Sequence, residues 1–294
     1  MTARLIDSPQ LPRDRVLAYS GLLKFPTIEP LSPLAVQSKA MEAQLRSARP
    51  SSRASLDRLC AALDRPDWEA AYSYPGLSDE LEPYVQAAED CHAVPAGRKA
   101  ATEFAVYARL AVRHVPLAAM DDEAFTRFLM AVHRRLGAGR NALRDGPVGL
   151  RPDAAGNRVL FPDHRLCPAL LSSLNGFLHA HLAAYPALCA SVAYAGIVYA
   201  HPFNDGNGRT ARTICNLILA GSAATRHFLP IQAIAARHPA FGIKLRRAIH
   251  GGDWLSLQTY FTEATRLSRA LQAGSNEKDP TYAQKKGEDN AAFK

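Results

Sequence analysis

An uncharged run at residues 182–200 constrains the fold of this chain more than any other feature. The run reads "LAAYPALCASVAYAGIVYA", and its length is close to the ~20 residues that a bilayer span requires. Its commonest residue is alanine, at seven of nineteen positions, which contributes little transfer free energy, and Pro186 lies inside it. A charged, glycine-rich stretch follows at once. We therefore expect a buried core helix and no membrane span.

Most of the remaining chain also has helical patterns. Residues 120–137 begin with acids and end with basic side chains before Gly137, which suits the helix dipole at both ends. Apolar spacings of three and four predict further helices in several other stretches. We expect helices at 32–48, 55–63, 77–88, 97–115, 120–137, 169–186, 210–224 and on both sides of Gly251-Gly252. The predicted fold class is mainly α.

Composition divides the chain into three regions. Residues 1–95 are expected to form an N-terminal arm and a helical region, because six prolines in the first 50 positions limit long regular elements. Residues 96–272 are expected to form the core domain. Residues 273–294 are polar and aperiodic, which predicts a disordered C-terminal tail.

The stretch 144–164, "RDGPVGLRPDAAGNRVLFPDH", breaks the helical pattern. It holds turn signals at Asp145-Gly146, at Gly149 and at Gly156-Asn157, and "NRVLF" is its only strand-like run. We expect a short β-hairpin or an extended flap here.

Charge and cysteine content narrow the class of protein. Apolar residues make up 48% and charged residues 21%, as in ordinary soluble proteins, and the net charge of +8 can attract anions. The arginines are dispersed and no nucleic-acid signature occurs, so we expect no nucleic-acid partner and a solvated helix face at Lys244, Arg246 and Arg247. The five cysteines lack metal or disulfide spacing, and residues 1–16 lack an apolar signal segment. Both observations favour a cytoplasmic location.

The stretch "HPFNDGNGRTAR", residues 201–212, directly follows the uncharged run. Asp205-Gly206-Asn207-Gly208 permits positive φ at successive residues, so backbone N–H groups can turn toward one point. The residues after Gly208 have a helical pattern, and a helix start adds unpaired N–H groups and partial positive charge. The backbone alone therefore predicts an anion site.

The side chains of this stretch sharpen that prediction. Arg209 and Arg212 are three apart, which places two like charges on one side of the new helix near its positive end. An absent anion of several charges, such as a polyphosphate, explains that arrangement. Asp205 suits Mg²⁺ bound between phosphates, and His201 is the one group here that can act as a base near neutral pH.

Two other interpretations of the stretch are weaker. A surface turn with solvated arginines accounts for "DGNG" alone but not for the full ordered set. A dinucleotide-binding fingerprint matches "GNGRTA", but it expects an acid about ~20 residues later, where the chain offers Arg226 and no acid.

The stretch 201–212 resembles the signature H-x-F-x-[DE]-G-N-G-R-x-x-R of Fic (filamentation induced by cAMP) proteins, with every defined position present. The likeness extends over roughly residues 100–270 and includes "RDGPVGLR", "NRVLF" and "GGDWLSLQTYF". It implies a Fic-type helical bundle with a β-hairpin flap beside the active-site loop. It also implies transfer of a nucleoside monophosphate, usually AMP from ATP, to a Ser, Thr or Tyr hydroxyl of a target protein.

The resemblance assigns a role to each motif residue. It implies that His201 takes the proton from the target hydroxyl and that Asp205 holds Mg²⁺. Phe203 anchors the loop in the core. The phosphate-binding positions are Gly206, Asn207 and Gly208 as the anion hole, with Arg209 and Arg212 on the β- and γ-phosphates. The flap positions, which align the target by strand addition, are Arg158, Val159, Leu160 and Phe161.

The same resemblance leaves the exact chemistry open. Kinase-type relatives have lysine in place of Gly208, so this chain keeps the nucleotidyl-transfer pattern. UMP, GMP or phosphocholine transfer stay open, as does a Fic-fold protein that binds nucleotide without transfer. The intact His201 and Asp205 favour the enzyme.

Regulation is where the chain departs from the family pattern. Many Fic proteins carry [ST]-x-x-x-E-[GN], whose glutamate pairs with the second motif arginine, and no glutamate here precedes Gly or Asn. We therefore expect either a separate antitoxin-like inhibitor chain or no inhibition of this kind. Tyr194, where relatives often have histidine, is a second departure. Action in the cell's own cytoplasm and delivery into another cell, as a toxin or effector, both stay open.

Overall fold

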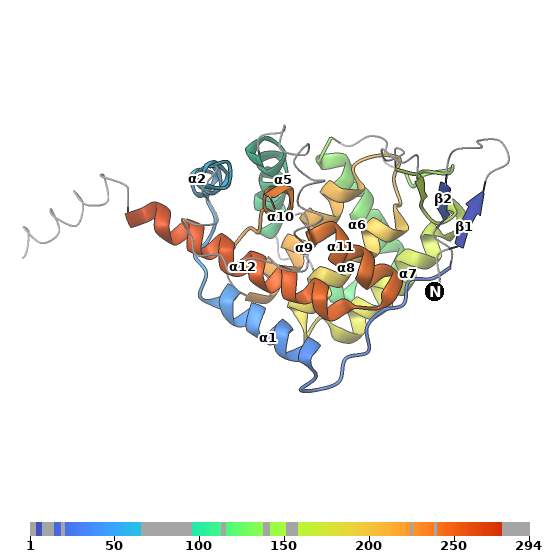
Figure 1. Ribbon diagram of the computed structural model, residues 1–294, viewed down its shortest axis with the longest axis horizontal. Coiled ribbons are helices and arrows are strands. Elements are labelled where there is room, and N and C mark those ends of the chain that lie inside the picture. Colours follow the sequence, from blue (N-terminus) through green and yellow to red (C-terminus); the bar gives the residue numbers. More distant parts are fainter. Residues whose placement is uncertain are drawn as a thin grey trace, which may run out of the picture.

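A computed structural model provides the structure of the protein (Figure 1). It describes residues 4–7, 15–18, 21–65, 96–112, 116–137, 142–150, 158–223, 226–237 and 240–277. Everything below refers to those residues. The helix expected at 77–88, part of the arm and most of the C-terminal tail lie outside them.

The described residues are mainly helical, which confirms the predicted fold class. The long helices are α1 (Pro33–Arg46), α2 (Arg53–Leu63), α5 (Ala96–Ala111), α6 (Asp122–Arg135), α7 (Cys167–His181), α8 (Pro186–Ala200), α9 (Asn207–Ala223), α10 (Ile231–Arg237), α11 (Ala240–Arg246) and α12 (Trp254–Glu277). A π-helix, Arg247–Gly251, joins α11 to α12, and two 3-10 turns occupy Leu117–Ala119 and His164–Leu166. Helix α8 packs against α9, α7, α1 and α12, and α1 runs beside α12 along one flank (Figure 1).

Helix α8 confirms the interpretation of the uncharged run. It begins with Pro186 in its first turn, where a missing N–H costs nothing, and every residue except Val198 is buried. Residues 182–184, the first part of the uncharged run, form a turn after α7 and are not part of α8. Gly196 permits close helix packing, because a Cβ there would lie 3.0 and 3.1 Å from the side-chain methyls of Leu174 on α7. None of the described helices is both long enough and apolar enough to cross a bilayer.

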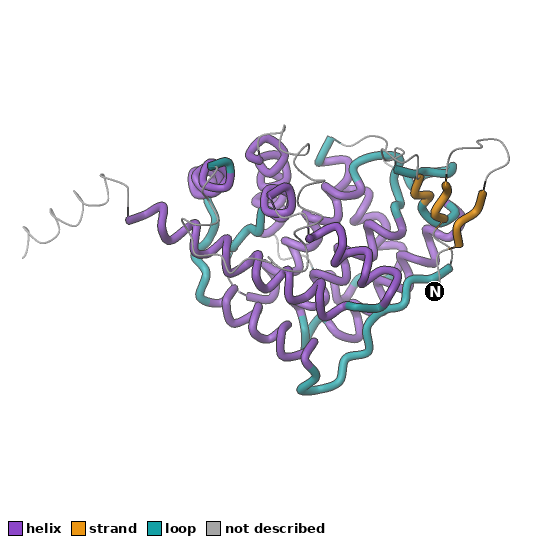
Figure 2. Tube along the Cα trace, viewed as in Figure 1, coloured by secondary structure: helices purple, strands orange, loops and turns teal. Residues whose placement is uncertain are grey.

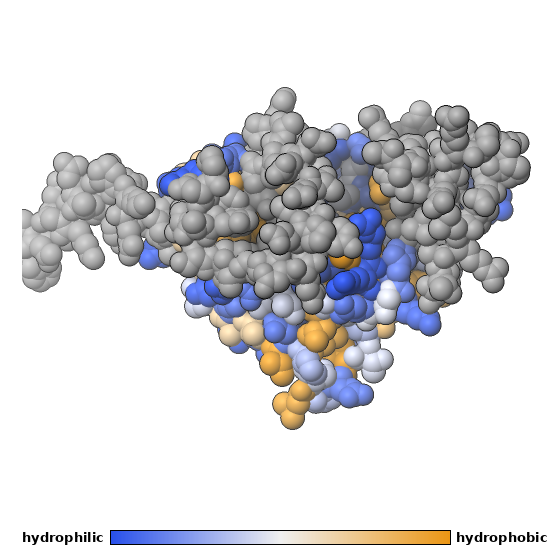
Figure 3. Space-filling view, viewed as in Figure 1, coloured by the Kyte–Doolittle hydropathy of each residue, from blue (hydrophilic) through white to orange (hydrophobic). Residues whose placement is uncertain are grey.

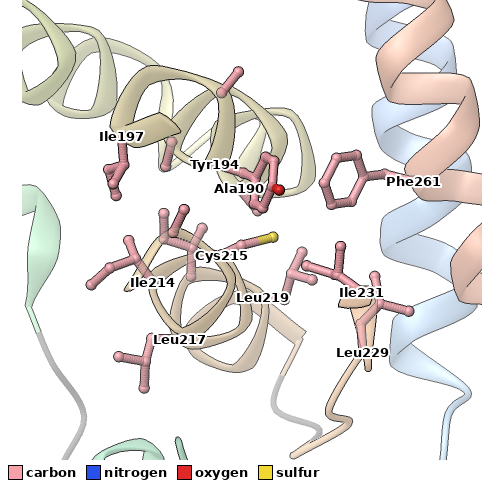
Figure 4. Packing of buried hydrophobic residues seen from close by; sticks show 14 of the residues in the cluster. Ala190, Tyr194, Ile197, Ile214, Cys215, Leu217, Leu219, Leu229, Ile231 and Phe261 are labelled. Atoms are coloured by element: carbon pink, nitrogen blue, oxygen red, sulfur yellow. The ribbon is translucent and has the colours of Figure 1, made fainter. Parts of the chain in front are cut away.

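The centre of the core lies between α8, α9 and α12 (Figure 4). Cys215 of α9 is fully buried there and enters the same apolar layer as Tyr194 of α8 and Phe261 of α12. Within the described ranges the cysteines are buried free thiols, namely Cys60, Cys167, Cys189 and Cys215.

Three short strands form a small sheet at one end of the molecule (Figures 1 and 2). Strand β1 (Arg4–Asp7) pairs antiparallel with β2 (Arg15–Ala18), and β2 pairs parallel with β3 (Arg158–Leu160). The predicted strand-like run is therefore β3, but its ladder partner is the N-terminal arm. A closed hairpin is not shown for the described part of residues 144–164, where Gly149 and Leu160 form a single antiparallel bridge.

A few apolar side chains face solvent around the first turn of α1. Leu31 is 90% exposed and Val36 is 54% exposed, and this tip of the molecule is apolar in the space-filling view (Figure 3). They are scattered rather than joined into a broad patch, which is ordinary for a protein surface.

Candidate active site

His201 caps the C-terminal end of the buried helix α8. Its backbone is left-handed, with φ 46° and ψ 54°, a conformation that costs a non-glycine residue roughly 1–2 kcal/mol. Such strained backbone is concentrated at functional sites. The turn aims the His201 imidazole at Phe161, and the two rings stack with centroids 3.6 Å apart and an interplanar angle of 12°.

The surroundings of His201 keep its ring neutral. Burial lowers the pKa of His201 to about 4, the nearby Arg144 also lowers it, and the hydrogen bond to Val198 together with the charge of Asp205 acts in the opposite direction. The His201 Nδ1 atom lies 3.2 Å from the Val198 carbonyl oxygen. A carbonyl only accepts, so Nδ1 carries the proton and Nε2 keeps its lone pair. The ring is thus an uncharged base at neutral pH.

Phe203 and Asn207 hold the loop that follows His201. Phe203 is buried at 1% exposure, and its backbone N–H donates to the Asn207 side-chain oxygen at 2.9 Å. The Asn207 amide nitrogen donates back to the Phe203 carbonyl at 2.7 Å. The Asn207 side chain therefore closes the loop, and its backbone N–H at the start of α9 adds to the donors that an anion would meet.

His133 of α6 supports the same loop from the other side. Its ring stacks on Phe203 with centroids 3.9 Å apart, and its Nε2 lies 2.8 Å from the Asp205 carbonyl oxygen. Gly206 follows with φ 79°, the left-handed region where a side chain is strained. The loop thus turns sharply at Gly206 into α9, as the glycine pattern predicts.

The first turn of α9 leaves backbone donors unpaired by the helix. The first helical hydrogen bond runs from the Thr210 N–H to the Gly206 carbonyl at 2.9 Å. The N–H groups of Asn207, Gly208 and Arg209 precede it and have no partner within the helix. Together with the dipole of this long helix, they give the start of α9 the backbone geometry that suits an anion, and anion binding there stays a prediction.

The two motif arginines lie on α9 but turn to different partners. Arg209 Nη2 lies 3.0 Å from the Asp205 carboxylate, an exposed pair in which Asp205 is 82% exposed and Arg209 29%. Arg212 instead meets the carboxylate of Glu103 on α5. The expectation of two unneutralised neighbouring charges is therefore wrong, because each guanidinium has its own acid.

The Arg212–Glu103 pair is almost completely buried. The Glu103 side chain is 1% exposed and that of Arg212 8%. Arg212 donates from Nε to both carboxylate oxygens at 3.0 Å and from Nη2 to one of them at 2.6 Å. Burial acts to lower the pKa of Arg212, but the Glu103 charge and a hydrogen bond with Tyr194 hold that pKa above its ordinary value. The arginine is therefore a fixed cation.

The third nitrogen of Arg212 faces the anion loop. A Cβ placed on Gly208 would lie 3.1 Å from Arg212 Nη1. Gly208 thus leaves the space that this guanidinium occupies, and a larger residue would push Arg212 away. Tyr194 of α8 contacts the same guanidinium, and burial raises the pKa of its phenol to about 12. Tyr194 is therefore a neutral hydrogen-bonding group in this cluster.

Arg144, before the flap, binds backbone carbonyls on both sides of the site. It is 4% exposed, and its Nε donates to the His201 carbonyl at 2.7 Å. Its two other nitrogens donate to the carbonyls of Gly146 and Pro162, and its backbone N–H donates to Pro202 at 2.8 Å. One side chain thus joins the end of α8 to the segment that leaves β3.

The structure describes all four predicted flap positions. Arg158, Val159 and Leu160 form β3, and Phe161 follows with its ring on His201. The Phe161 backbone N–H donates to the Val148 carbonyl at 3.0 Å. The flap therefore leads directly into the site.

Three buried residues of the site were missed by the sequence reasoning: Glu103, His133 and Arg144. Glu103 carried a usable signal, since it occupies the apolar stripe Ala100, Glu103, Val106 and Leu110 of α5. A carboxylate on a core-facing stripe predicts a buried cationic partner. His133 and Arg144 bind backbone carbonyls, and no sequence pattern identifies such partners.

The protein is a helical bundle in which a short loop joins His201, at the end of α8, to the start of α9. This loop is the predicted anion site. Comparisons with known proteins agree. Residues 125–219 match the model of the Fic/DOC family, so this part of the chain is similar to that family.

Three solved structures are similar to this chain. A Fic family protein from Desulfovibrio desulfuricans G20 is 19% identical with a TM-score of 0.57, over 87% of this chain and 78% of that chain. Fic-1 (residues 134–508) from C. elegans is 18% identical over 83% and 72% of the two chains, with a TM-score of 0.47. A Fic domain containing signaling protein from Bacteroides thetaiotaomicron VPI-5482 is 14% identical over 82% and 94%, with a TM-score of 0.45. The Desulfovibrio protein shares the fold of this chain.

Asp205 is the side chain that fits a magnesium ion. Its carboxylate is exposed beside the unpaired N–H groups of α9, and Mg²⁺ favours one or two such carboxylates together with phosphate oxygens. No cluster of three or more metal-ligating side chains occurs in the described part of the chain. A metal here would therefore be held by Asp205 together with the substrate phosphates.

Proposed function

We propose that this protein transfers AMP from ATP to a Ser, Thr or Tyr hydroxyl of a target protein. The observation that carries the proposal is the state of His201, a neutral ring with Nδ1 occupied and Nε2 free, at the start of an anion-binding helix. A base so placed removes the proton from an attacking hydroxyl, which typically accelerates transfer by about 10²–10⁴-fold.

The remaining groups divide the work of binding the nucleotide. The N–H groups of residues 207–209 and the α9 dipole bind phosphate oxygens, and Arg209 adds a half-exposed charge. Mg²⁺, held by Asp205, supplies neutralisation of phosphate charge. Positioning and charge neutralisation carry most of the catalysis in phosphoryl-type transfers. The hydroxyl attacks the α-phosphorus, its proton passes to His201, and pyrophosphate leaves.

Arg212 is restrained within this chain. It already binds Glu103 through two of its three nitrogens, so a polyphosphate must share it with that carboxylate or displace it. We propose that Glu103 is the internal acid that limits Arg212, although it lies outside the [ST]-x-x-x-E-[GN] pattern. A separate antitoxin-like chain is then not required to neutralise this arginine.

Intact mass spectrometry after incubation with ATP and Mg²⁺ tests the proposal, using the protein alone and with candidate targets. We expect a gain of one AMP that disappears in His201→Ala. His179→Ala, a change at an exposed histidine of α7, is the matched control and should keep the adduct. Parallel reactions with UTP and GTP identify the nucleotide. Tight ATP binding without any adduct would instead favour a nucleotide-binding protein without transfer.

A further inference from the structure

Both edges of strand β3 are already occupied by this chain. On one edge β2 pairs with β3 in parallel, with Val16 opposite Arg158, Leu17 opposite Val159 and Ala18 opposite Leu160. On the other edge Gly149 forms a bridge with Leu160, and the next N–H, that of Phe161, binds Val148. An extended peptide can add to β3 only where one of these neighbours leaves.

The edge held by β2 lies close to the reactive histidine. Phe161, the residue directly after β3, stacks on the His201 ring, and Arg144 links the next carbonyl, that of Pro162, to the His201 carbonyl. A segment lying along β3 is therefore carried toward His201. Strand β2 holds that position, and the N-terminal arm is defined here as β1 and β2, residues 4–7 and 15–18.

The chain that follows the arm is anchored to the core. The Gly21 carbonyl accepts a hydrogen bond from Tyr199 at 2.9 Å, two residues before His201. Phe25 stacks on Phe177 of α7 with centroids 5.1 Å apart, and the Lys24 carbonyl accepts from Trp254 of α12 at 3.2 Å. Only two residues separate Ala18 from Gly21, so the arm is tethered beside β3 at a high effective concentration.

The arm is nonetheless weakly held compared with the core. It contributes short strands of four residues each, and its ladder with β3 spans three residue pairs. Short edge pairings are among the parts of a protein that open most easily. Backbone pairing also carries little sequence specificity, so another extended segment can make the same bonds.

We propose that the N-terminal arm is an intramolecular occupant of the β3 edge, which an extended segment of the target protein replaces. This inference rests on the proposed function for the identity of the target. The partner it describes is an extended peptide with a hydroxyl residue placed one step beyond the paired strand, beside His201. Arm pairing then lowers the apparent affinity for targets while the nucleotide site is unchanged.

Hydrogen–deuterium exchange at the amides of residues 158–161 tests the occupancy without requiring transfer activity. We compare the full chain with a chain that lacks residues 1–18 and with the full-length double variant Val16→Pro/Leu17→Pro. Proline removes the N–H groups that a ladder needs. Leu11→Pro, which lies between the two strands, is the matched control. The deletion and the double proline variant should exchange faster within residues 158–160, and Leu11→Pro should not. The Phe161 amide, which binds the Val148 carbonyl on the other edge, should stay protected in all of them.

A synthetic peptide of residues 3–20 provides the reverse experiment. Added to the shortened chain, it should restore protection within residues 158–160. Unchanged exchange in both arm variants would overturn the inference, whether or not the protein transfers AMP. Faster exchange that the peptide reverses supports the occupancy even if no adduct is ever formed, in which case only the proposed function fails.

Kinetics measure the competition between the N-terminal arm and the target once a target protein is known. The shortened chain should show a KM for the target about tenfold lower than the full chain, since the lost pairing is worth about that factor. Its KM for ATP should not change. An unchanged KM for the target would overturn the competition.

Discussion

At the scale of single residues, the buried pair of Glu103 and Arg212 dominates the energetics of the site. Each charge is removed from water, and the pair is tolerable only because three hydrogen bonds join the two groups. Removing one partner leaves the other uncompensated. The same pair also competes with any anion bound at the start of α9, so stability and ligand affinity are linked through Glu103.

Glu103→Gln should therefore destabilise the protein and strengthen ATP binding. The free energy of unfolding should fall by about 3 kcal/mol, because Arg212 is left buried without a counter-charge. ATP then supplies the missing negative charge, and its Kd should fall about tenfold, measured by calorimetry alongside urea unfolding.

Glu263→Gln is the matched control for this change. Glu263 pairs with Arg266 on α12 at 2.8 Å, and the two side chains are partly exposed to solvent, at 35% and 42%. Exposed pairs of this kind contribute little, so both measurements should stay near the wild-type values. Weaker ATP binding in Glu103→Gln would show that the carboxylate orients Arg212 rather than restrains it.

Arg144 is a positioning residue, because it reaches the site only through backbone carbonyls. Arg144→Lys keeps the charge but loses the planar fork that binds His201, Gly146 and Pro162 together. We expect kcat to fall by about ten- to a hundredfold, the usual cost of a small misplacement of reacting groups. The KM for ATP should be nearly unchanged.

The same replacement at Arg135 serves as the comparison. Arg135 is exposed on α6 and binds only the Ala131 carbonyl of its own helix, so Arg135→Lys should leave kcat unaltered. An equal loss of kcat and of ATP affinity in Arg144→Lys would contradict a positioning role. It would point instead to a collapse of the whole loop.

At the scale of elements, the burial of helix α8 could be predicted from its sequence, but the long-range contacts around the site could not. The nineteen uncharged residues 182–200 predict a buried helix, and the glycines of the next stretch predict the sharp turn at Gly206. The loop is thus anticipated by backbone preferences alone. Glu103 approaches Arg212 from α5, more than a hundred residues away, and such a long-range contact leaves no local trace.

The contact of α7 with α8 predicts opposite changes in stability when two glycines are replaced by alanine. Gly196→Ala should destabilise by about 1–3 kcal/mol, because the new methyl would meet Leu174 at 3.0 Å. Gly176→Ala lies on the exposed side of α7 with nothing within 4 Å. It should stabilise by up to about 1 kcal/mol, since alanine favours the helix.

Urea unfolding of the two variants checks this pair. Both changes add the same methyl group to neighbouring helices, so a common effect on propensity cancels in the comparison. If Gly196→Ala were as stable as Gly176→Ala, the close approach of α7 and α8 would not limit the packing.

At the scale of the whole molecule, the helical class was predictable because helix signals are local. The sheet was not, since β3 pairs with residues about 140 positions earlier in the chain. The arm was predicted as an irregular segment from its prolines, but β1 lies before Pro9 and β2 lies between Pro12 and Pro26. Strand pairing depends on which edge is open in the folded protein, and the sequence around β3 does not report that.

His227 joins three distant parts of the molecule and should make its stability depend on pH. It is 1% exposed, its Nδ1 lies 3.3 Å from the Arg49 carbonyl, and its Nε2 lies 3.2 Å from the Ser268 hydroxyl on α12. Nδ1 must donate to the carbonyl, so Nε2 accepts from Ser268 and the ring is neutral. Burial lowers the pKa of His227 to about 4.

The direction in which stability changes with pH follows from proton binding in the folded and unfolded states. The unfolded chain takes up a proton near pH 6.5, and the folded protein does so only near pH 4, so the unfolded state binds more protons between those values. Stability should therefore be full above pH 6.5 and fall by about 1.4 kcal/mol per pH unit from this group as pH drops toward 4. Urea midpoints at pH 7.5, 6.0 and 5.0 measure the slope. His227→Gln, which can still donate and accept, should remove the share of the slope that His227 contributes and leave that of His201, whose pKa is also lowered to about 4, whereas His179→Gln at the exposed face of α7 should keep the full slope. An unchanged slope in His227→Gln would assign the pH dependence to other groups.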